Sequence, residues 1–173
     1  MGKEALLVID MLNDFVEKGA VLEVPSARKI IPQIKKRIEE ARKKQIKVIY
    51  VCDAHQKNDK EFQNWPPHAI LGTRGAEIIE ELKPGREDLV VKKRRYSGFF
   101  GTDLDLLLRE LEIKKIYIVG ILTNICVFFT AVDASVRGYE VTIYADSVAT
   151  ISEREHKFAL RQLKDTFKIK VTE

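Results

Sequence analysis

Short, mostly apolar runs recur along the chain and constrain its fold more than any other feature. Six of them predict strands, at residues 5–9, 47–52, 89–91, 116–119, 141–144 and 169–171. Most of them lack the polar–apolar alternation of a half-exposed strand, and such runs are typical of strands that are buried on both faces. Helical patterns separate them. This alternation predicts an α/β fold, a three-layer, doubly wound and mainly parallel sheet flanked by helices.

The intervening segments carry apolar residues at helical spacing and helix-start signals. The chain offers Ser26 as an N-cap before an apolar stripe that runs from Ile30 to Ala41. A short helix is expected at residues 77–82. Capping boxes are expected where Thr102 precedes Asp105 and where Ser152 precedes Glu155. His156, in the last predicted helix, is expected on a solvent-facing surface.

Size and composition predict one globular domain over residues 1–173. Hydrophobic residues make up 45% of the chain and charged residues 32%. The net charge of +4 is modest, and the basic residues are scattered, so nucleic acid is not an expected partner. No apolar stretch approaches membrane-spanning length, so no membrane partner is expected. Two cysteines and no signal peptide before the first strand predict a cytoplasmic protein.

Cys126 stands at a predicted strand–turn–helix elbow. The apolar run at residues 116–119 ends at Gly120, and Thr123 and Asn124 are both good N-caps for a helix that continues to about Arg137. A thiol in the first helical turn lies near unpaired backbone N–H groups, which favour the nucleophilic thiolate. The alternative is a buried cysteine that only packs, and packing is the interpretation we favour for Cys52.

Three other chemical groups follow predicted strands, namely Asp10, Asp53 and Lys93. Ligands of open parallel sheets bind outside the carboxyl ends of the strands, so these side chains are expected to converge with Cys126. A thiol, a carboxylate to take its proton and an ammonium group form a set suited to nucleophilic catalysis. The alternatives are that Asp10 only caps a turn and that Lys93 belongs to a solvated basic run, residues 92–95.

A candidate metal site lies in the long irregular stretch 53–74. Asp53 and His55 point the same way if the strand geometry continues, and His68 follows later in the same loop. Two imidazoles and one carboxylate form an open site for a divalent ion, for which Zn²⁺ or Fe²⁺ fits best. The alternative is a pair of histidines on a surface loop with no metal.

Five stretches together are similar to one known family. They are residues 8–15 (VIDMLNDF), 53–55 (DAH), 65–75 (WPPHAILGTRG), 93–104 (KRRYSGFFGTDL) and 120–127 (GILTNICV). The chain resembles the isochorismatase-like cysteine hydrolases, and within them the nicotinamidases. The resemblance covers essentially the whole chain. Leu12, Ala54, Gln56 and Asn124 depart from the usual nicotinamidase pattern, and these departures bear on the substrate more than on the chemistry.

The resemblance implies roles for particular residues. It implies a catalytic triad of Asp10, Lys93 and Cys126, and a cis peptide between Ile121 and Leu122. It implies that the backbone N–H groups of Leu122 and Cys126 form the oxyanion hole. The resemblance also implies a metal site and a ring pocket, with ligands Asp53, His55 and His68 and pocket residues Phe15 and Trp65. Zn²⁺ is the expected metal, with Fe²⁺ or Mn²⁺ as alternatives.

The activity implied is hydrolysis of nicotinamide to nicotinate and ammonia through a cysteine thioester. One alternative is a hydrolase of another small amide or carbamoyl compound, or an isochorismatase-type hydrolase. Another is a non-catalytic protein on the same fold. The family also implies a homodimer or homotetramer.

Overall fold

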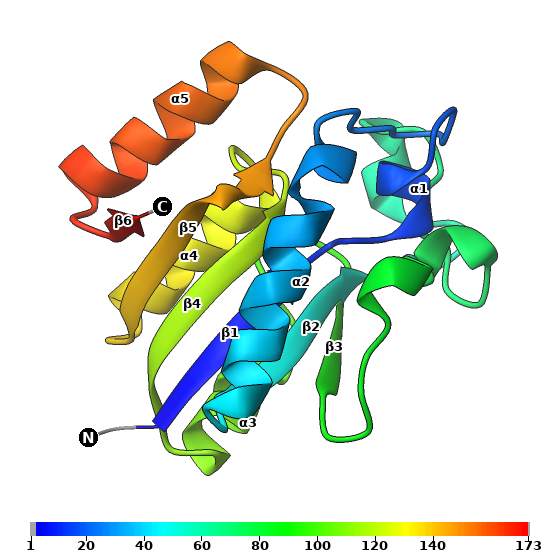
Figure 1. The fold of residues 1–173 in the computed structure, drawn as a ribbon. Helices are drawn as coiled ribbons and strands as arrows, with labels where there is room; N and C mark the ends of the chain where they lie inside the picture. Colours follow the sequence, from blue (N-terminus) through cyan, green and yellow to red (C-terminus); the bar gives the residue numbers. More distant parts are fainter. Residues whose placement is uncertain (1–2, 173) are drawn as a thin grey trace.

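A single parallel sheet organises the molecule. The computed structural model describes residues 3–172, and within them the sheet has six strands: β1 (Lys3–Ile9), β2 (Lys47–Asp53), β3 (Leu89–Lys93), β4 (Ile113–Ile121), β5 (Glu140–Ala149) and β6 (Lys170–Thr172). Their order is β3-β2-β1-β4-β5-β6, and all neighbouring pairs are parallel (Figure 1). The predicted α/β fold is confirmed, and the sheet is parallel throughout rather than mainly so.

Helices cover both faces of this sheet. The long helix α2 (Ala27–Lys43) packs on one face, in front of the sheet in Figure 1. The helices α3 (Leu104–Glu110) and α4 (Cys126–Val136) pack on the other. The last helix, α5 (Glu153–Arg161), continues into a π-helical turn, η4 (Gln162–Thr166), which contacts α4 and β6. Short elements complete the fold: α1 (Asn13–Val16) and the 3₁₀ turns η1 (Lys60–Gln63), η2 (Arg74–Ala76) and η3 (Glu80–Leu82).

The central strand shows why the apolar runs are continuous. In β1, Leu7 and Ile9 point into the core beside α3 and α4, whereas Leu6 and Val8 point into the core beside α2. Successive side chains of a strand face opposite sides, so a strand covered on both faces needs apolar residues at every position. Each of these side chains is almost completely buried, which contributes about 1.5–3 kcal/mol apiece.

The prediction of a short helix at residues 77–82 is wrong for most of that segment. Only the 3₁₀ turn Glu80–Leu82 forms there. The Asn13 N–H donates to the Glu77 carbonyl, and the Ile79 N–H donates to the Met11 carbonyl. These bonds tie the segment to the loop after β1, and they use backbone groups that a helix would need for itself.

Helix starts were predicted with mixed success. The Ser152 side chain caps α5 by accepting a hydrogen bond from the Glu155 N–H at 3.4 Å, as expected. Ser26 does not cap α2, because its hydroxyl donates to the Thr150 carbonyl instead. Thr102 accepts from the Leu104 N–H, but its expected partner Asp105 accepts a hydrogen bond from the Tyr139 hydroxyl. In both cases a side chain that was expected to take part in capping forms a hydrogen bond with a residue far away in the sequence instead.

Gly120, near the end of β4, occupies a position that no other residue fits. Its φ is +114°, and a Cβ atom there would overlap the carbonyl oxygen and the nitrogen of Ile9 in the neighbouring strand. Because those atoms belong to the central strand, they cannot move aside without breaking the ladder.

Replacing Gly120 with alanine is therefore expected to lower the free energy of unfolding by about 3 kcal/mol or more. Gly138 provides the control, because it also has a positive φ, +86°, but its missing Cβ would meet no atom within 4 Å. Gly138→Ala is expected to cost about 1 kcal/mol, from backbone strain alone. Urea denaturation of both variants measures the difference. Equal losses would show that the close approach to Ile9 is unimportant.

Candidate active site

The sheet order brings four chemical groups to one rim. Asp10 directly follows β1, Asp53 ends β2 and Lys93 ends β3, where Asp53 and Lys93 are register partners. Cys126 is the first residue of α4, which follows β4 on the other side of β1. Asp10 has a φ of +50°, a left-handed conformation that aspartate tolerates better than most residues. The carboxyl ends of four adjacent strands therefore deliver these side chains to the same place.

Lys93 lies at the centre of this group. Its Nζ is 2.8 Å from Asp10 Oδ2, 2.6 Å from Asp53 Oδ1 and 3.4 Å from Cys126 Sγ. The other oxygen of Asp10 accepts the Asp53 backbone N–H at 2.7 Å. The Lys93 side chain has no exposed surface, so it does not belong to a solvated basic run. Thiol, carboxylate and ammonium group thus share one buried cluster.

The electrostatics of the cluster keep Cys126 in its thiol form, contrary to the expectation that the helix N-terminus favours the thiolate. Burial and the nearby charge of Asp53 raise the pKa of Asp10 to about 6, against the opposing effect of Lys93. Burial alone would lower the pKa of Lys93, but Asp10 and Asp53 outweigh it and hold that pKa well above its usual range. Burial raises the pKa of the Cys126 thiol well above normal. The thiol therefore needs a base, and a carboxylate that titrates near neutrality can accept and return a proton.

The elbow between β4 and α4 differs in detail from its prediction. The N-cap of α4 is Ile125, and neither Thr123 nor Asn124 caps the helix. Thr123 Oγ1 instead pairs with His156 Nδ1 at 3.0 Å, and Asn124 Oδ1 accepts from the Thr150 hydroxyl at 2.6 Å. His156 is therefore half-buried against the elbow rather than on a solvent-facing surface, and burial lowers its pKa.

The same elbow holds two free backbone donors. The Ile121–Leu122 peptide is cis, as the resemblance implies. Within residues 3–172, the N–H groups of Leu122 and Cys126 donate to no backbone carbonyl. Unpaired N–H groups beside a nucleophile are suited to hold an oxyanion.

Asp53, His55 and His68 also converge. They are buried, and one potential ligand atom from each lies within 4.8 Å of the others. Asp53 Oδ2 is 3.6 Å from His55 Nε2 and 3.8 Å from His68 Nε2, while Asp53 Oδ1 pairs with Lys93. One carboxylate therefore serves both the lysine cluster and the histidine pair.

The ring nitrogens of both histidines are arranged as a metal site requires. His68 Nδ1 lies 2.8 Å from the Pro66 carbonyl, so that nitrogen carries the proton. His55 Nδ1 lies 3.2 Å from the Asp59 carboxylate and carries its proton for the same reason. In the neutral form of each ring, Nε2 therefore carries the lone pair, and His55 Nε2 is buried without any hydrogen-bond partner. The His55 Nε2 atom is thus buried, lacks a hydrogen-bond partner and faces a carboxylate and a second imidazole. This arrangement is suited to binding a divalent cation.

A narrow, mostly apolar cavity opens onto Cys126. Both predicted pocket residues, Phe15 and Trp65, line it together with Asp10, Asp53 and His68. The Trp65 indole N–H donates to the Tyr96 hydroxyl at 3.0 Å, which fixes the indole. Sequence reasoning missed several further lining residues: Leu22, Val24, Glu61, Tyr96, Ile125 and Ile151. They come from loops, from the N-cap of α4 and from the 3₁₀ turn η1, and no periodic pattern shows which of these segments meet.

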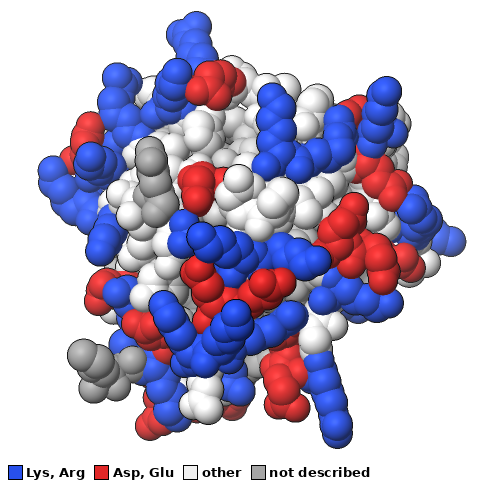
Figure 2. All heavy atoms as spheres, viewed as in Figure 1, with Lys and Arg blue, Asp and Glu red and all other residues white. Residues whose placement is uncertain are grey.

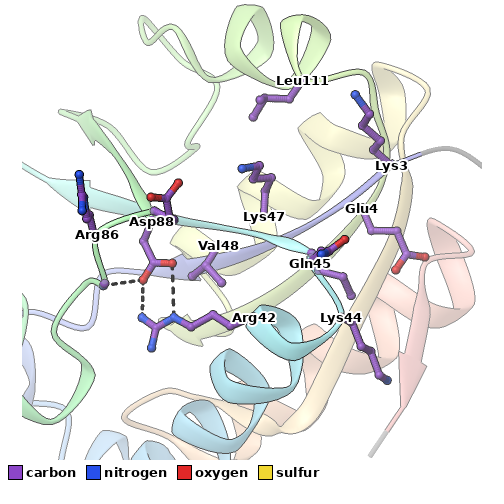
Figure 3. A pocket seen from close by; sticks show the side chains of 13 residues that line it. Lys3, Glu4, Arg42, Lys44, Gln45, Lys47, Val48, Arg86, Asp88 and Leu111 are labelled. Carbon is purple, nitrogen blue, oxygen red and sulfur yellow. Dashed lines mark hydrogen bonds and ion pairs between the residues drawn. The ribbon is translucent and has the colours of Figure 1, made fainter.

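A larger hollow lies at the opposite, amino end of the strands (Figure 3). Its described lining residues include Lys3, Lys47 and Arg86 but neither cysteine nor histidine. Two charged side chains in it, Arg42 and Asp88, pair with each other. On the face shown in Figure 2, basic and acidic side chains are intermingled. No helix within residues 3–172 has the length and apolar character that a bilayer crossing requires.

Comparison with known proteins identifies the family. The protein-family model described as the isochorismatase domain matches residues 4–173 of the sequence. The chain belongs to the isochorismatase-like hydrolase family. Its fold and the grouping of Asp10, Lys93 and Cys126 agree with that membership.

Three solved structures of this hydrolase family illustrate its range. The nicotinamidase/pyrazinamidase PncA of Bacillus subtilis is 34% identical, with a TM-score of 0.94 over 99% of this chain and 100% of that one. The pyrazinamidase of Pyrococcus horikoshii, in complex with zinc, is 34% identical, with a TM-score of 0.93 over 99% of both chains. The N-carbamoylsarcosine amidase of Thermoplasma acidophilum is 35% identical, with a TM-score of 0.90 over 98% of this chain and 95% of that one.

Proposed function

We propose that this protein is a cysteine amidase that hydrolyses nicotinamide to nicotinate and ammonia. The observation that carries the proposal is the position of Asp53, whose two carboxylate oxygens face Lys93 and the His55–His68 pair. Cys126 and two of the proposed metal ligands, Asp53 and His68, line the same mostly apolar cavity. Similarity to a nicotinamidase/pyrazinamidase and to a zinc-containing pyrazinamidase supports it.

In the proposed acylation step, Asp10 takes the proton from Cys126 Sγ, and the thiolate forms a bond to the amide carbon. The N–H groups of Leu122 and Cys126 hold the resulting oxyanion, which is worth several kcal/mol in such sites. Lys93 keeps its charge throughout and stabilises both anionic partners. Asp10 then passes its proton to the amide nitrogen, the C–N bond breaks and ammonia leaves a thioester on Cys126.

Deacylation repeats these steps with water. Asp10 takes a proton from the water, whose oxygen attacks the thioester carbon at the same oxyanion hole. The C–S bond breaks, and Cys126 recovers its proton from Asp10, so the starting state returns. The product leaves as nicotinic acid, which loses its own proton to solvent to give nicotinate. The raised pKa of Asp10, about 6, suits a group that must accept and return a proton in each half of the cycle.

Asp53, His55 and His68 would hold the metal, which would supply a Lewis acid for the pyridine nitrogen. Zn²⁺ matches a set of two imidazoles and one carboxylate, and Fe²⁺ and Mn²⁺ accept the same ligands. Phe15 and Trp65, which line the cavity, would contact the faces of the ring.

A second candidate substrate is a small carbamoyl compound. The 35% identity to an N-carbamoylsarcosine amidase favours it, as do Leu12 and Asn124, which depart from the usual nicotinamidase pattern. The same triad chemistry would serve it.

We also propose that the protein is a single domain, that it is located in the cytoplasm and that it forms a homodimer or homotetramer. Neither nucleic acid nor a membrane is proposed as a partner.

An ammonia-release panel separates these candidates. Nicotinamide and pyrazinamide are expected to be hydrolysed with kcat/KM at least tenfold above that for N-carbamoylsarcosine. Preference for the carbamoyl compound would replace nicotinamide as the proposed substrate and keep the cysteine chemistry. No ammonia from any amide would contradict the amidase proposal altogether.

Removal of metal tests how the ring is held. Exhaustive chelation is expected to raise KM for nicotinamide at least about tenfold, because a contact worth 1.4 kcal/mol or more is lost. Adding Zn²⁺, Fe²⁺ or Mn²⁺ back to the stripped protein is expected to restore KM. An unchanged KM in protein shown by elemental analysis to be metal-free would remove the metal from substrate binding.

A further inference from the structure

We propose that Asp59 is a positioning residue for the metal site. Arg94 and Arg95 hold the carboxylate of Asp59 in place. This carboxylate fixes the tautomer and orientation of His55, and it thereby sets the affinity of the site for a divalent cation. This inference rests on the proposed metal site, and it gives a role to Asp59 and to two arginines of the basic run that the proposed catalytic steps leave unused.

Both carboxylate oxygens of Asp59 have defined hydrogen-bond partners. Its side chain is completely buried. Oδ1 accepts from the Glu61 backbone N–H at 3.1 Å and from Arg95 Nη1 at 2.9 Å. Oδ2 accepts from Arg94 Nε at 2.8 Å and faces His55 Nδ1 at 3.2 Å. Each oxygen thus has one arginine partner and one further donor, which fixes the plane of the carboxylate.

This carboxylate determines which nitrogen of His55 can bind a cation. Two guanidinium groups and the Glu61 backbone N–H donate to Asp59, so its carboxylate acts as an acceptor and the His55 Nδ1 that faces it carries a proton. The Nε2 lone pair then faces Asp53, where it has no hydrogen-bond partner. A carboxylate behind a ligating imidazole also raises its basicity as a ligand.

The two arginines connect this support to the nucleophile cluster. Arg94 and Arg95 directly follow Lys93, whose ammonium group pairs with Asp10 and Asp53. One short segment at the end of β3 therefore holds Asp53 through Lys93 and His55 through Asp59. Backbone hydrogen bonds to Ala69 and Leu71 hold the main chain of His55, and the ion pairs of Asp59 add to them by fixing its ring.

The two histidines differ in how they are supported. His68 Nδ1 donates to a backbone carbonyl, that of Pro66, which no side-chain substitution removes. His55 depends on the Asp59 side chain. Changing Asp59 should therefore weaken one ligand and leave the other two in place, so a partial loss of metal affinity is expected rather than a complete one.

The decisive variant is Asp59→Asn, which keeps the shape but has one acceptor oxygen where the carboxylate has two. Because each oxygen position has two donors against it, the new amide N–H₂ must face either Arg94 and His55 or Arg95 and the Glu61 N–H. We expect a 10- to 100-fold higher Kd for Zn²⁺ and Co²⁺, measured by competition with a chromophoric chelator. The absorption bands of bound Co²⁺ are expected to change as well.

Asp88→Asn is the matched control. Asp88 is also a largely buried aspartate that accepts from a backbone N–H, that of Gly85, and pairs with an arginine, Arg42, at the opposite end of the sheet (Figure 3). It is expected to lose comparable thermal stability and to keep the wild-type Kd. Equal metal affinity for Asp59→Asn and wild type would overturn the role of Asp59. Absence of metal binding by the wild type would instead contradict the proposed metal site.

A measurement on the unchanged protein does not depend on the folding of any variant. The chain has three histidines, so ring ¹⁵N spectra of the metal-free protein can be assigned. His55 is expected as the Nδ1–H tautomer with a slowly exchanging ring proton. An Nε2–H tautomer for His55 would overturn the inference even if Asp59→Asn failed to fold.

Discussion

Replacing Cys126 with alanine is expected to abolish ammonia release while the fold survives. Cys126 supplies the atom that would become bonded to the substrate carbon, and the described residues place no second thiol against the cavity. Loss of a nucleophile in a comparable covalent mechanism costs more than about 10⁴-fold in kcat. The variant removes one sulfur from a buried site, so its unfolding free energy is expected to change by only about 1 kcal/mol.

Cys52→Ala is the control for this experiment. Cys52 is also buried and reduced, but it packs among the apolar side chains beside α2 and does not line the cavity. Its replacement is expected to cost a similar amount of stability and to leave kcat within about twofold of wild type. Residual turnover above 1% in Cys126→Ala, with Cys52→Ala unchanged, would contradict a covalent thioester.

Replacing Lys93 with methionine is expected to have the largest effect on stability. The substitution leaves two carboxylates, Asp10 and Asp53, buried without their cation. Breaking a buried ion pair by removing one partner costs about 3–5 kcal/mol, a large part of the stability of a domain of this size. Lys92→Met is the control, because Lys92 is exposed in the same strand, and its effect is expected to be within about 0.5 kcal/mol.

The loss in Lys93→Met is expected to depend on pH. The pKa of Asp10 is already raised to about 6 in the native protein, and without Lys93 it is expected to rise further. The folded variant then binds a proton more tightly than the unfolded chain, so its stability falls as the pH rises through neutrality. Urea denaturation of the metal-free variant at pH 5 and pH 8 measures this, and the larger deficit is expected at pH 8. A deficit independent of pH would show that Asp10 does not carry the uncompensated charge.

The sequence predicted the framework because the inner strands β2, β1, β4 and β5 are largely buried on both faces, and short, continuous apolar runs separated by helical patterns are typical of such strands. It also placed Asp10, Asp53, Lys93 and the Cys126 elbow at one rim, since parallel strands deliver their carboxyl ends together. Strand ends were less predictable. β4 begins at Ile113 and β5 continues to Ala149, because hydrogen bonds to neighbouring strands extend them through polar residues.

Long-range side-chain contacts explain most of what sequence patterns could not give. Asp59 looks like any loop aspartate until Arg94 and Arg95 are seen against it. Likewise, Lys93 is indistinguishable in sequence from its exposed neighbour Lys92, and only the alternation of strand faces separates them. Local signals such as the Thr102–Asp105 pair failed for the same reason, since a partner from elsewhere in the chain took the hydrogen bond.

The shared carboxylate of Asp53 limits how a site of this kind can be altered. One oxygen balances the charge of the ammonium group, and the other faces the imidazoles, so under the proposed function any change at this position would disturb both bond-making and recognition of the ring. His55 and His68 belong to the proposed metal site alone and do not pair with the Lys93 ammonium group. Redesign toward amides without a ring nitrogen should therefore exchange the imidazoles first and retain the aspartate, so that selectivity is altered while the machinery for cleavage is spared.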